Sequence, residues 1–447
     1  MRYIPNSPEE RAEMLNSLGL DSPEELFASI PNDLLLRNHL NVPAALSELE
    51  LLARFDRLGQ KNAGPARISF LGGGAYAHYI PTVVDHVISR SEFFTAYTPY
   101  QPEISQGTLQ AIFEFQTLVC QLTGMEVANA SMYDGSTALA EAVLMAERVT
   151  GKSKVIAARS VHPQYLEVVE TYVQHAGIEL EIADFDGESG LVNATLNDRI
   201  DDQTAAIVVQ SPNFFGAVED IARLADTAHA KGALLIVAVA EAISLGLLKP
   251  PGACGADIVI AEGQSLGVPL SFGGPYVGLF AVSERHARQM PGRLVGEAYD
   301  KHGRRGFVLT LATREQHIRR EKATSNICTN EGLIALAATV YMETMGRKGI
   351  QEVAWQCAQK AAYAAEKIGE LDGFSLRFSG PRFNEFVVRG PIEAKQILRP
   401  LADEAGIDAG IALSRFYPDC EKDFLVCVTE INTREEIDAL VQGLAHY

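Results

Sequence analysis

The stretch that decides the fold lies between residues 204 and 263. It reads TAAIVVQSP (204–212), IARLADTAHAKG (221–232), ALLIVAV (233–239) and DIVIAEG (257–263). Short apolar, β-branched runs bounded by turn residues alternate here with a run whose apolar residues repeat at i, i+3 and i+4. Strands that read as continuous apolar runs are buried on both faces, as in a parallel sheet covered by helices. The stretch therefore predicts a three-layer α/β/α domain.

The same alternation is present earlier in the chain. Residues 154–160 (KVIAARS) and 178–185 (IELEIADF) have the strand pattern, and residues 162–177 and 191–200 follow them with helical patterns. Each of these strands should therefore be followed by a helix that covers the sheet. We assign the large α/β domain to residues 66–330.

The regions on either side have a different character. Residues 1–65 predict an N-terminal helical arm, in which Ser7 and Ser22 each precede a glutamate by three residues, as in a capping box. Residues 331–447 begin with two long helical patterns separated near Gly346 and continue with shorter strands and helices. This order predicts a smaller C-terminal α+β domain.

Composition limits the classes of function. The chain has 447 residues, 47% of them hydrophobic, and a formal net charge of −19. This charge argues against broad nucleic-acid binding, because little basic surface is left to neutralise phosphates. No run approaches the about 18 apolar residues of a membrane-spanning helix, and the N-terminus lacks the apolar core of a signal peptide.

The six cysteines are scattered, with no C-x-x-C pair. In a chain of this size, that pattern indicates reduced thiols in the cytoplasm rather than a disulfide framework or a zinc site. We therefore expect a cytoplasmic protein without a structural metal.

Open α/β sheets bind ligands at the carboxyl ends of their strands. The run Asp134-Gly135-Ser136-Thr137 opens a helix after a short strand. Its N–H groups and hydroxyls suit a phosphate, but such residues also serve simply as helix caps. His162 follows the strand at 154–160 and suits either the face of an aromatic cofactor ring or a structural role.

This order of motifs resembles the fold-type-I enzymes of pyridoxal phosphate (PLP). In that family, one strand ends in an aspartate that keeps the pyridine nitrogen protonated, and the next ends in a lysine that binds the aldehyde. Here Ala238 stands at the aspartate position and Ser265 at the lysine position. No lysine occurs between Lys249 and Lys301, so a shift of register does not supply one.

The chemistry needs both groups, because the lysine forms the internal aldimine and the protonated ring makes the cofactor an electron sink. Alanine and serine do neither. We therefore expect no PLP chemistry in this chain's own pocket, and we interpret Asp134, Ser136, Thr137 and His162 as remnants of an ancestral cofactor site.

Longer blocks of sequence indicate one family. Residues 97–107 (YTPYQPEISQG) and 314–329 (REQHIRREKATSNICT) resemble signature segments of glycine decarboxylase, the P-protein of the glycine cleavage system. Residues 128–137 (ANASMYDGST) and the opening at 2–27 are similar to the same family. The resemblance extends over essentially the whole chain.

P-proteins occur as one long chain or as two subunits, and this chain resembles the α subunit (subunit 1) of the two-subunit type. The resemblance implies a partner, a β subunit of the same fold that carries the lysine and the PLP, and a pair of such pairs. It implies that glycine is decarboxylated on the partner's PLP, that CO2 is released, and that the aminomethyl group passes to the lipoate of the H-protein. Its departure at Ala238 and Ser265 is what an α subunit requires.

Two segments are candidates for a contribution to a shared site. In this family, a loop at the end of the large domain reaches the neighbour's cofactor. Thr324, Ser325 and Asn326 are therefore candidates for binding the PLP phosphate in trans. Arg319, Arg320 or Lys322 either assist them or form only ion pairs at the subunit interface. The second segment carries Pro99 and Pro102, which exclude it from a core strand. Its Tyr97, Thr98, Tyr100 and Gln101 either line the mouth of the shared site or anchor the subunit interface.

Other readings remain. A non-catalytic scaffold or regulatory subunit with a PLP-type fold equally lacks the lysine. An aminotransferase or cysteine-desulfurase relative is disfavoured by the missing lysine. The glycines at 72–74 indicate close backbone approach or positive φ, and they do not form a dinucleotide-binding motif.

Overall fold

The computed structural model describes residues 5–36, 38, 40–62, 67–328 and 330–447. The chain divides into two compact units, Met1–Gly64 and Pro65–Tyr447. Each unit is described by itself. The predicted domain boundary at residues 65 and 66 lies outside the described residues, as do the start of the 2–27 block and Thr329.

Unit 1 consists of short helices without a core. It contains α1 (Pro8–Ser17), the 3₁₀ helix η1 (Pro23–Phe27) and α2 (Glu48–Gly59). Ser7 forms the predicted capping box with Glu10. The capping box predicted at Ser22 is wrong, because this segment is a 3₁₀ turn in which the Ser22 hydroxyl donates to Glu25 instead. None of the described residues of these three helices is buried.

Unit 2 is built on a seven-stranded sheet with the order β2-β8-β7-β6-β5-β3-β4. Its strands are β2 (Val127–Ala128), β3 (Lys154–Ala158), β4 (Glu179–Ala183), β5 (Thr204–Gln210), β6 (Leu234–Val239), β7 (Ile258–Glu262) and β8 (Gly278–Val282). The five strands from β3 to β7 run parallel, and β8 is antiparallel to both of its neighbours. Every residue of β5, β6 and β7 is buried, as their continuous apolar runs predict.

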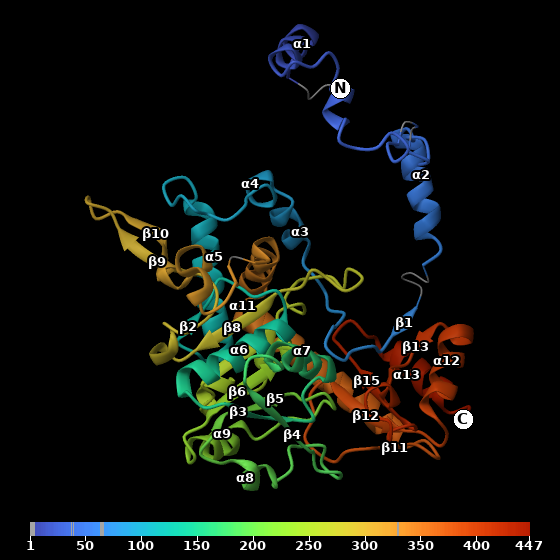
Figure 1. Cartoon of the computed structure of the whole chain (residues 1–447). Helices are drawn as coiled ribbons and strands as arrows, with labels where there is room; N and C mark the ends of the chain where they lie inside the picture. Colours follow the sequence, from blue (N-terminus) through green and yellow to red (C-terminus); the bar gives the residue numbers. More distant parts are fainter. Residues whose placement is uncertain (1–4, 37, 39, 63–66, 329) are drawn as a thin grey trace. The chain divides into compact units, whose positions relative to one another are not determined.

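Helices pack on this sheet (Figure 1). The helices of this part are α3 (Thr82–Ile88), α4 (Ser91–Phe94), α5 (Gln106–Thr123), α6 (Gly135–Thr150), α7 (Pro163–Val173), α8 (Leu196–Arg199) and α9 (Ile221–His229), with 3₁₀ turns η3 (Ala242–Gly246) and η4 (Pro251–Cys254). Of these helices, α5, α6, α7 and α9 contact strands of the sheet. The helix expected over residues 191–200 is reduced to the single turn of α8. Val192 and Leu196 still bury their side chains, so an apolar spacing alone did not distinguish a helix from an irregular segment.

The C-terminal part contains a second, four-stranded sheet with the order β11-β12-β15-β14. Its elements are α11 (Gly332–Gly369), β11 (Ser375–Leu376), β12 (Glu385–Arg389), α12 (Ala394–Ala405), β13 (Ile407–Asp408), β14 (Ile411–Ala412), η8 (Leu413–Arg415), β15 (Asp423–Cys427) and α13 (Arg434–Leu444). The two helices predicted on either side of Gly346 are present, since Gly346 has φ 58° and ψ −179° and interrupts α11. Strand β1 (Ile68–Ser69) pairs with β13, so the first residues of unit 2 lie against its last part.

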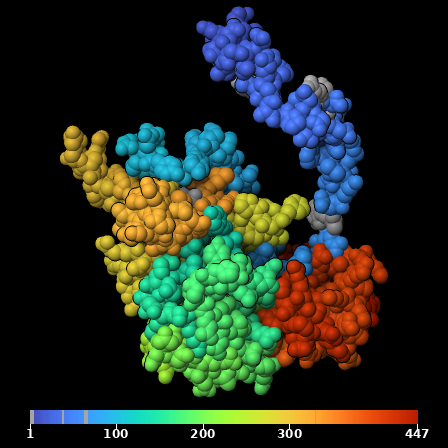
Figure 2. Space-filling view, viewed as in Figure 1, coloured from blue at the N-terminus to red at the C-terminus, as the bar shows by residue number. Residues whose placement is uncertain are grey.

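A separate antiparallel hairpin joins β9 (Leu294–Tyr299) and β10 (Arg305–Thr310). Figure 2 shows it standing out from the body of unit 2. Short turns flank it, namely η5 (Glu284–His286), η6 (Ala312–Arg314), α10 (Gln316–Arg319) and η7 (Arg320–Lys322). Within the described parts of the chain, no helix is long and apolar enough to cross a membrane.

Candidate functional site

The two positions that decide cofactor chemistry lie on one strand of the large sheet and just after the end of the neighbouring strand. Ala238 is on β6, where it pairs with Ile260 of β7, and Ser265 follows the end of β7. Both are buried, and among the described residues the Ser265 Oγ has no hydrogen-bond partner. Neither strand therefore supplies the amine or the carboxylate that PLP chemistry needs.

Two carboxylates occupy the N-terminus of α6. The Asp134 side chain accepts hydrogen bonds from the Thr137 amide at 2.8 Å and from the Ser136 hydroxyl at 2.6 Å. Glu262, at the end of β7, accepts from the Gly135 amide at 2.9 Å. The N–H groups that a phosphate would need are therefore satisfied by the chain itself.

The surroundings of this helix end also disfavour a bound phosphate. Burial, together with the nearby Asp134 charge, raises the pKa of Glu262 to about 8, although the Gly135 amide opposes the shift. A Cβ atom at Gly135 would lie 2.4 Å from the Tyr165 hydroxyl, so the site is also sterically closed. A dianionic phosphate here would face two acidic side chains at contact distance.

The glycine-rich segment lies against His162. The His162 Nε2 donates to the Gly73 carbonyl at 2.7 Å, and Nδ1 accepts from the Gln164 amide at 3.2 Å. A Cβ at Gly74, whose φ is 108°, would lie 2.8 Å from the imidazole. The imidazole stacks on the Tyr165 ring, with 4.8 Å between ring centroids and 27° between the planes. Burial lowers the pKa of His162, which agrees with a neutral ring.

Two further side chains hold the glycine-rich segment in place. The Gln264 amide bonds both the N–H of Tyr76, at 2.8 Å, and its carbonyl, at 2.9 Å. Glu385 of β12 accepts from the Gly73 amide at 2.7 Å and from the Tyr76 hydroxyl at 3.0 Å. The backbone that covers His162 is thus fixed by side chains from both sheets.

A buried charge cluster adjoins this segment. The His78 Nε2 lies 2.9 Å from Glu241, which follows β6, and Nδ1 lies 2.6 Å from Glu430, which follows β15. Burial opposes charge on His78, but Glu241, Cys357 and Glu430 outweigh it and raise the pKa of His78 well above its usual range. Both ring nitrogens are engaged in short hydrogen bonds, so the group is an imidazolium clamped between two carboxylates.

These residues do not fit PLP. The cofactor requires a lysine, an acid beside the ring nitrogen, an anion site and room for its ring. The chain offers Ser265 and Ala238 for the first two. Carboxylates take the anion site, and the Gly73 backbone contacts His162 directly. No step of PLP chemistry is therefore assigned to this pocket.

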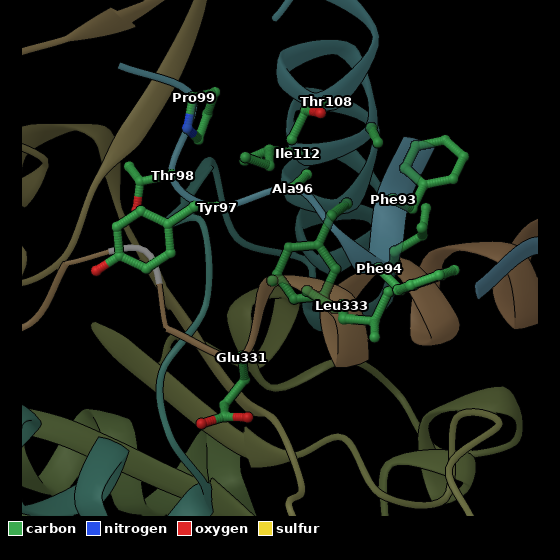
Figure 3. A pocket seen from close by; sticks show the side chains of 15 residues that line it. Phe93, Phe94, Ala96, Tyr97, Thr98, Pro99, Thr108, Ile112, Glu331 and Leu333 are labelled. Atoms are coloured by element: carbon green, nitrogen blue, oxygen red, sulfur yellow. The ribbon is translucent and has the colours of Figure 1, made fainter. Parts of the chain in front are cut away.

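A second region, which we call the open face, has the opposite character. It comprises residues 93–104, 311–328 and 330–336. A cavity of about 250 Å³ lies within it, lined by Phe93, Phe94, Ala96, Tyr97, Thr98, Pro99, Thr108, Ala111, Ile112, Phe115, Glu331, Gly332, Leu333, Ala335 and Leu336. Figure 3 shows the apolar Phe93, Phe94 and Leu333 gathered on one side and Tyr97 with Thr98 on the other. The Tyr97 side chain is 85% exposed.

Neighbouring residues hold Tyr100 and strand β10 beside this face. The guanidinium of Arg293 lies 4.9 Å from the Tyr100 ring centroid, and the same group pairs with Glu315 at 2.7 Å. The Gln106 side chain bonds both the N–H and the carbonyl of Phe307, each at 2.9 Å. Tyr100 thus rests on a buried ion pair, whereas Gln101 is exposed and makes no such contact among the described residues.

The three residues predicted to act in trans do not share one orientation. Ser325 is directed inward, and its hydroxyl donates to Glu141 of α6 at 2.9 Å. Thr324 is half-buried and Asn326 is exposed. Their segment is anchored at its end, where the Ser131 hydroxyl donates to the Asn330 carbonyl. Thr324 and Asn326 therefore remain available to another chain, and Ser325 does not.

Three of the six described non-glycine residues with positive φ lie on the open face. Leu311, Arg320 and Glu331 have φ between 53° and 54°, a region that residues other than glycine rarely occupy. Each such residue costs about 1–3 kcal/mol and persists only where its surroundings impose it. Residues of this kind cluster at functional segments.

Several residues of the closed pocket escaped the sequence-based prediction. Glu262, Gln264, Tyr165 and Glu385 fill or seal it, yet none follows a recognised motif. One signal was present, since Glu262 ends a fully apolar strand and a buried carboxylate needs a partner. Its partner, the Gly135 amide, is 127 residues away in sequence and is visible only in the fold.

Comparison with known proteins identifies relatives across the full length. The family model described as glycine cleavage system P-protein matches residues 1–444. A probable glycine dehydrogenase (decarboxylating) subunit 1 of Desulforamulus reducens is 53% identical over 99% of both chains. A similar protein with the same description in Koribacter versatilis is 52% identical over 100% of both chains.

Solved structures agree. A crystal structure of glycine decarboxylase (P-protein), in inhibitor-bound form, matches with a TM-score of 0.90 and 43% identity, over 100% of both chains. A sphingosine-1-phosphate lyase of Burkholderia pseudomallei matches with a TM-score of 0.65 and 14% identity, over 94% of this chain and 95% of that one, which shows the fold alone. The predicted fold-type-I PLP architecture is confirmed.

Proposed function

Because this chain belongs to the glycine cleavage system P-protein family, we propose that it is subunit 1 of a two-subunit glycine decarboxylase and acts only beside a second, lysine-bearing chain. The relatives that match it end to end are described as subunit 1 of glycine dehydrogenase, which supports a second subunit. In this proposal, the assembled enzyme releases CO2 from glycine and passes the aminomethyl group to the lipoyl arm of H-protein. The PLP belongs to the second subunit.

One observation carries the proposal. The pocket at the strand ends is filled by this chain's own Glu262, Tyr165 and Gly73, while a strained face with exposed tyrosines remains uncovered. A subunit that completes a neighbour's site needs such a face and no cofactor pocket. All six cysteines are unpaired, which supports the cytoplasmic location that we include in the proposal.

The test compares the isolated chain with the chain co-expressed with a P-protein subunit 2. We expect no aldimine absorbance, no borohydride-trapped PLP adduct and no glycine–bicarbonate exchange with the isolated chain, and all three with the pair. Exchange by the isolated chain would overturn the proposal. The alternative, a scaffold or regulatory subunit, would be supported if the two chains assemble but subunit 2 alone decarboxylates glycine as well as the pair does.

We place Tyr97, Thr98, Tyr100 and Gln101 at the mouth of the shared site. Support comes from the cavity that Tyr97 and Thr98 line and from the Arg293 guanidinium under Tyr100. In the assembled enzyme, Tyr97→Phe should raise the KM for glycine or for the carrier if the hydroxyl binds either of them. Wild-type kinetics with intact assembly would leave Tyr97 with a packing role only.

Within the same proposal, Thr324 and Asn326 reach the partner's PLP phosphate, supported by their availability beside the inward-directed Ser325. The double variant Thr324→Ala/Asn326→Ala should weaken PLP binding by the assembled enzyme at least tenfold, since each hydrogen bond to a charged group contributes about 1.5–3 kcal/mol. Ser325→Ala is the matched control and should lower only the stability of this chain. Unchanged PLP affinity in the double variant would remove these residues from the site.

A further inference from the structure

A buried group of side chains joins three distant parts of unit 2. It consists of His78 in the segment that follows the glycines, Cys357 on α11 and Glu430 just after β15, and we call it the His78 cluster. One ligand atom from each residue lies within 4.8 Å of the other two. Because His78 and Glu430 are 352 positions apart in sequence, only the fold brings these residues together.

The Glu430 carboxylate contacts both other members of the cluster. Its Oε2 lies 2.6 Å from the His78 Nδ1 and 3.4 Å from the Cys357 Sγ, while its Oε1 accepts from the Tyr79 amide at 2.7 Å. Around a tetrahedral zinc ion, neighbouring ligand atoms lie roughly 3.3–3.6 Å apart. The distance between Cys357 and Glu430 already has this value, and the distance between His78 and Glu430 needs to widen by roughly 0.7 Å.

The second nitrogen of His78 is placed as in a metal-binding histidine. Such a histidine donates its other ring N–H to a carboxylate, which fixes the tautomer and orients the ring. The His78 Nε2 lies 2.9 Å from the Glu241 carboxylate, whereas Nδ1 faces Glu430. The side chains of His78 and Glu241 are both 2% exposed. The carboxylate–histidine arrangement found beside zinc is therefore present.

The charge of this region also suits a divalent ion. Without metal, His78 is an imidazolium between two carboxylates, and burial raises the pKa of the Cys357 thiol to about 11. One excess negative charge is thus buried. A divalent ion that displaces the imidazolium proton and the thiol proton leaves this buried charge unchanged, so binding adds no unpaired charge to the interior.

A buried polar atom near the cluster is a separate observation. The Tyr341 side chain is fully buried, and among the described residues its hydroxyl has no hydrogen-bond partner. Burial is the main cause that raises the pKa of Tyr341, and the charges of the His78 cluster also act on it, so the hydroxyl lies near the cluster. Buried polar atoms of this kind commonly hold a water molecule or face an ion. A metal-bound water supplies both a partner for Tyr341 and the fourth ligand of a tetrahedral ion.

We infer that the His78 cluster is a binding site for a zinc ion. His78, Cys357 and Glu430 are its ligands, and Glu241 is a positioning residue that orients His78. A thiolate together with an imidazole favours zinc over calcium and magnesium, which take oxygen ligands. The ion connects the segment after the glycines to α11 and to the end of β15, and so holds the backbone that covers His162.

The sequence-based expectation of a chain without a structural metal relied on the absence of C-x-x-C pairs. That absence does not exclude a site assembled from three distant segments. The inference is independent of the proposed function, because it concerns only residues of this chain and its test needs no glycine decarboxylation.

The experiment uses the full-length chain, freed of metal with a chelator and then titrated with Co²⁺ or with Zn²⁺. We expect one ion per chain. Bound Co²⁺ should show tetrahedral absorption bands and a thiolate-to-cobalt charge-transfer band in the near ultraviolet, and Zn²⁺ should displace it. Zn²⁺ should also raise the temperature midpoint of unfolding, because the unfolded chain lacks the assembled site.

Two cysteine variants locate the ion. Cys357→Ala should fold, because a buried free cysteine packs as a small apolar residue, and it should lose the charge-transfer band and the stabilisation by Zn²⁺. The matched control is Cys427→Ala, which removes a comparably buried thiol outside the cluster and should keep both.

Glu241→Gln tests the positioning role, since it leaves all three ligands in place. It should weaken Zn²⁺ binding about 10–100-fold and keep the charge-transfer band. An unchanged affinity would remove Glu241 from the site.

The inference of a zinc site fails on any of four results. These are no stoichiometric binding by the wild-type chain, bound Co²⁺ without a charge-transfer band, a band that persists in Cys357→Ala, and equal loss of the band in both cysteine variants. Persistence in Cys357→Ala would mean an adventitious ion held elsewhere. If Cys357→Ala did not fold, the wild-type cobalt spectrum would still decide, because only a thiolate ligand produces that band.

Discussion

The pocket at the strand ends and the open face differ in how far the chain itself covers and pairs their side chains. In the pocket, Glu262 accepts a hydrogen bond from the Gly135 amide, Gln264 from the Tyr76 amide and Glu385 from the Gly73 amide. The Gly73 carbonyl accepts from His162. On the open face, Tyr97 is 85% exposed and Tyr100 is 57% exposed. One region is complete within the chain, whereas the other leaves aromatic rings exposed.

In the proposed function, the two regions meet different physical demands. A pocket without its ligand leaves buried polar groups that cost free energy, so it gains by being filled. A face that contacts another chain keeps features that are costly in isolation, such as exposed aromatic rings and the positive φ of Leu311 and Glu331.

The largest expected effect comes from breaking the closed pocket. Gly74→Ala introduces a Cβ about where the His162 ring lies, 2.8 Å from Nε2, at a φ of 108°. We expect the free energy of unfolding to fall by roughly 3 kcal/mol, because both the contact and the backbone conformation are unfavourable. Urea unfolding of the isolated chain measures this loss.

Gly107→Ala is the matched control on the side of the open face. Gly107 lies in α5, and no atom outside its own neighbourhood lies within 4 Å of an added Cβ. Alanine should be neutral or stabilise the helix by up to about 1 kcal/mol. Equal losses in the two variants would contradict the contrast between a filled and an open region.

A smaller effect is expected from the charge of Glu262. Its pKa is about 8 in the folded chain and about 4.3 in an unfolded one. Between these values the folded state holds a proton that the unfolded state has lost, so stability falls as the pH rises and levels off above the folded pKa. Glu262→Gln removes this pH dependence. It also replaces the side-chain oxygen of residue 262 that accepts a hydrogen bond from the Gln264 backbone amide.

The variant should therefore be less stable than the wild type by about 1 kcal/mol at pH 5 and more stable by about 2 kcal/mol at pH 7.5. The measurement is urea unfolding of both proteins across this range. Other buried acids, such as Glu385, contribute equally to both curves and cancel in the difference. Parallel curves would show that Glu262 is ionised in the fold.

Relief of strain on the open face should have a still smaller effect. Glu331 has φ 53° and ψ 34°, which asparagine and glycine tolerate better than glutamate. Glu331→Gly should stabilise the isolated chain by about 1 kcal/mol, seen as a higher urea midpoint. The same variant should assemble less well if the fixed backbone serves the partner. A destabilised isolated chain would show that no strain is stored there.

The smallest expected effect is that of Tyr97→Ala on the isolated chain. The ring is almost fully exposed, so the free energy of unfolding should change by less than about 0.5 kcal/mol. In the assembled enzyme the same change should weaken association or activity about tenfold. A clear loss of stability in the isolated chain would place Tyr97 in the fold instead.

Much of the fold was predictable because it depends on local patterns. The apolar runs of β5, β6 and β7 and the helices on either side of Gly346 can be read directly from spacing and composition. The single turn at residues 196–199 was missed because its apolar spacing fits both a helix and an irregular segment. Ser22 has the spacing of a capping box, but its turn is 3₁₀.

The filled pocket was beyond a local pattern. The replacements Ala238 and Ser265 can be read from the strands, but their surroundings join residues far apart in sequence. The contact between Gly73 and Glu385 spans 312 positions, and that between Tyr76 and Gln264 spans 188. Only the three-dimensional arrangement brings these groups together.

The glycine-rich segment over His162 would oppose the introduction of PLP chemistry into this pocket. A point mutation that returned a lysine at Ser265 would meet a site whose anion position is taken by Glu262 and whose ring position is crossed by the backbone at Gly73. Reversal would need several simultaneous changes, each unfavourable on its own. In the proposed function, ordinary packing therefore keeps the cofactor on the second subunit.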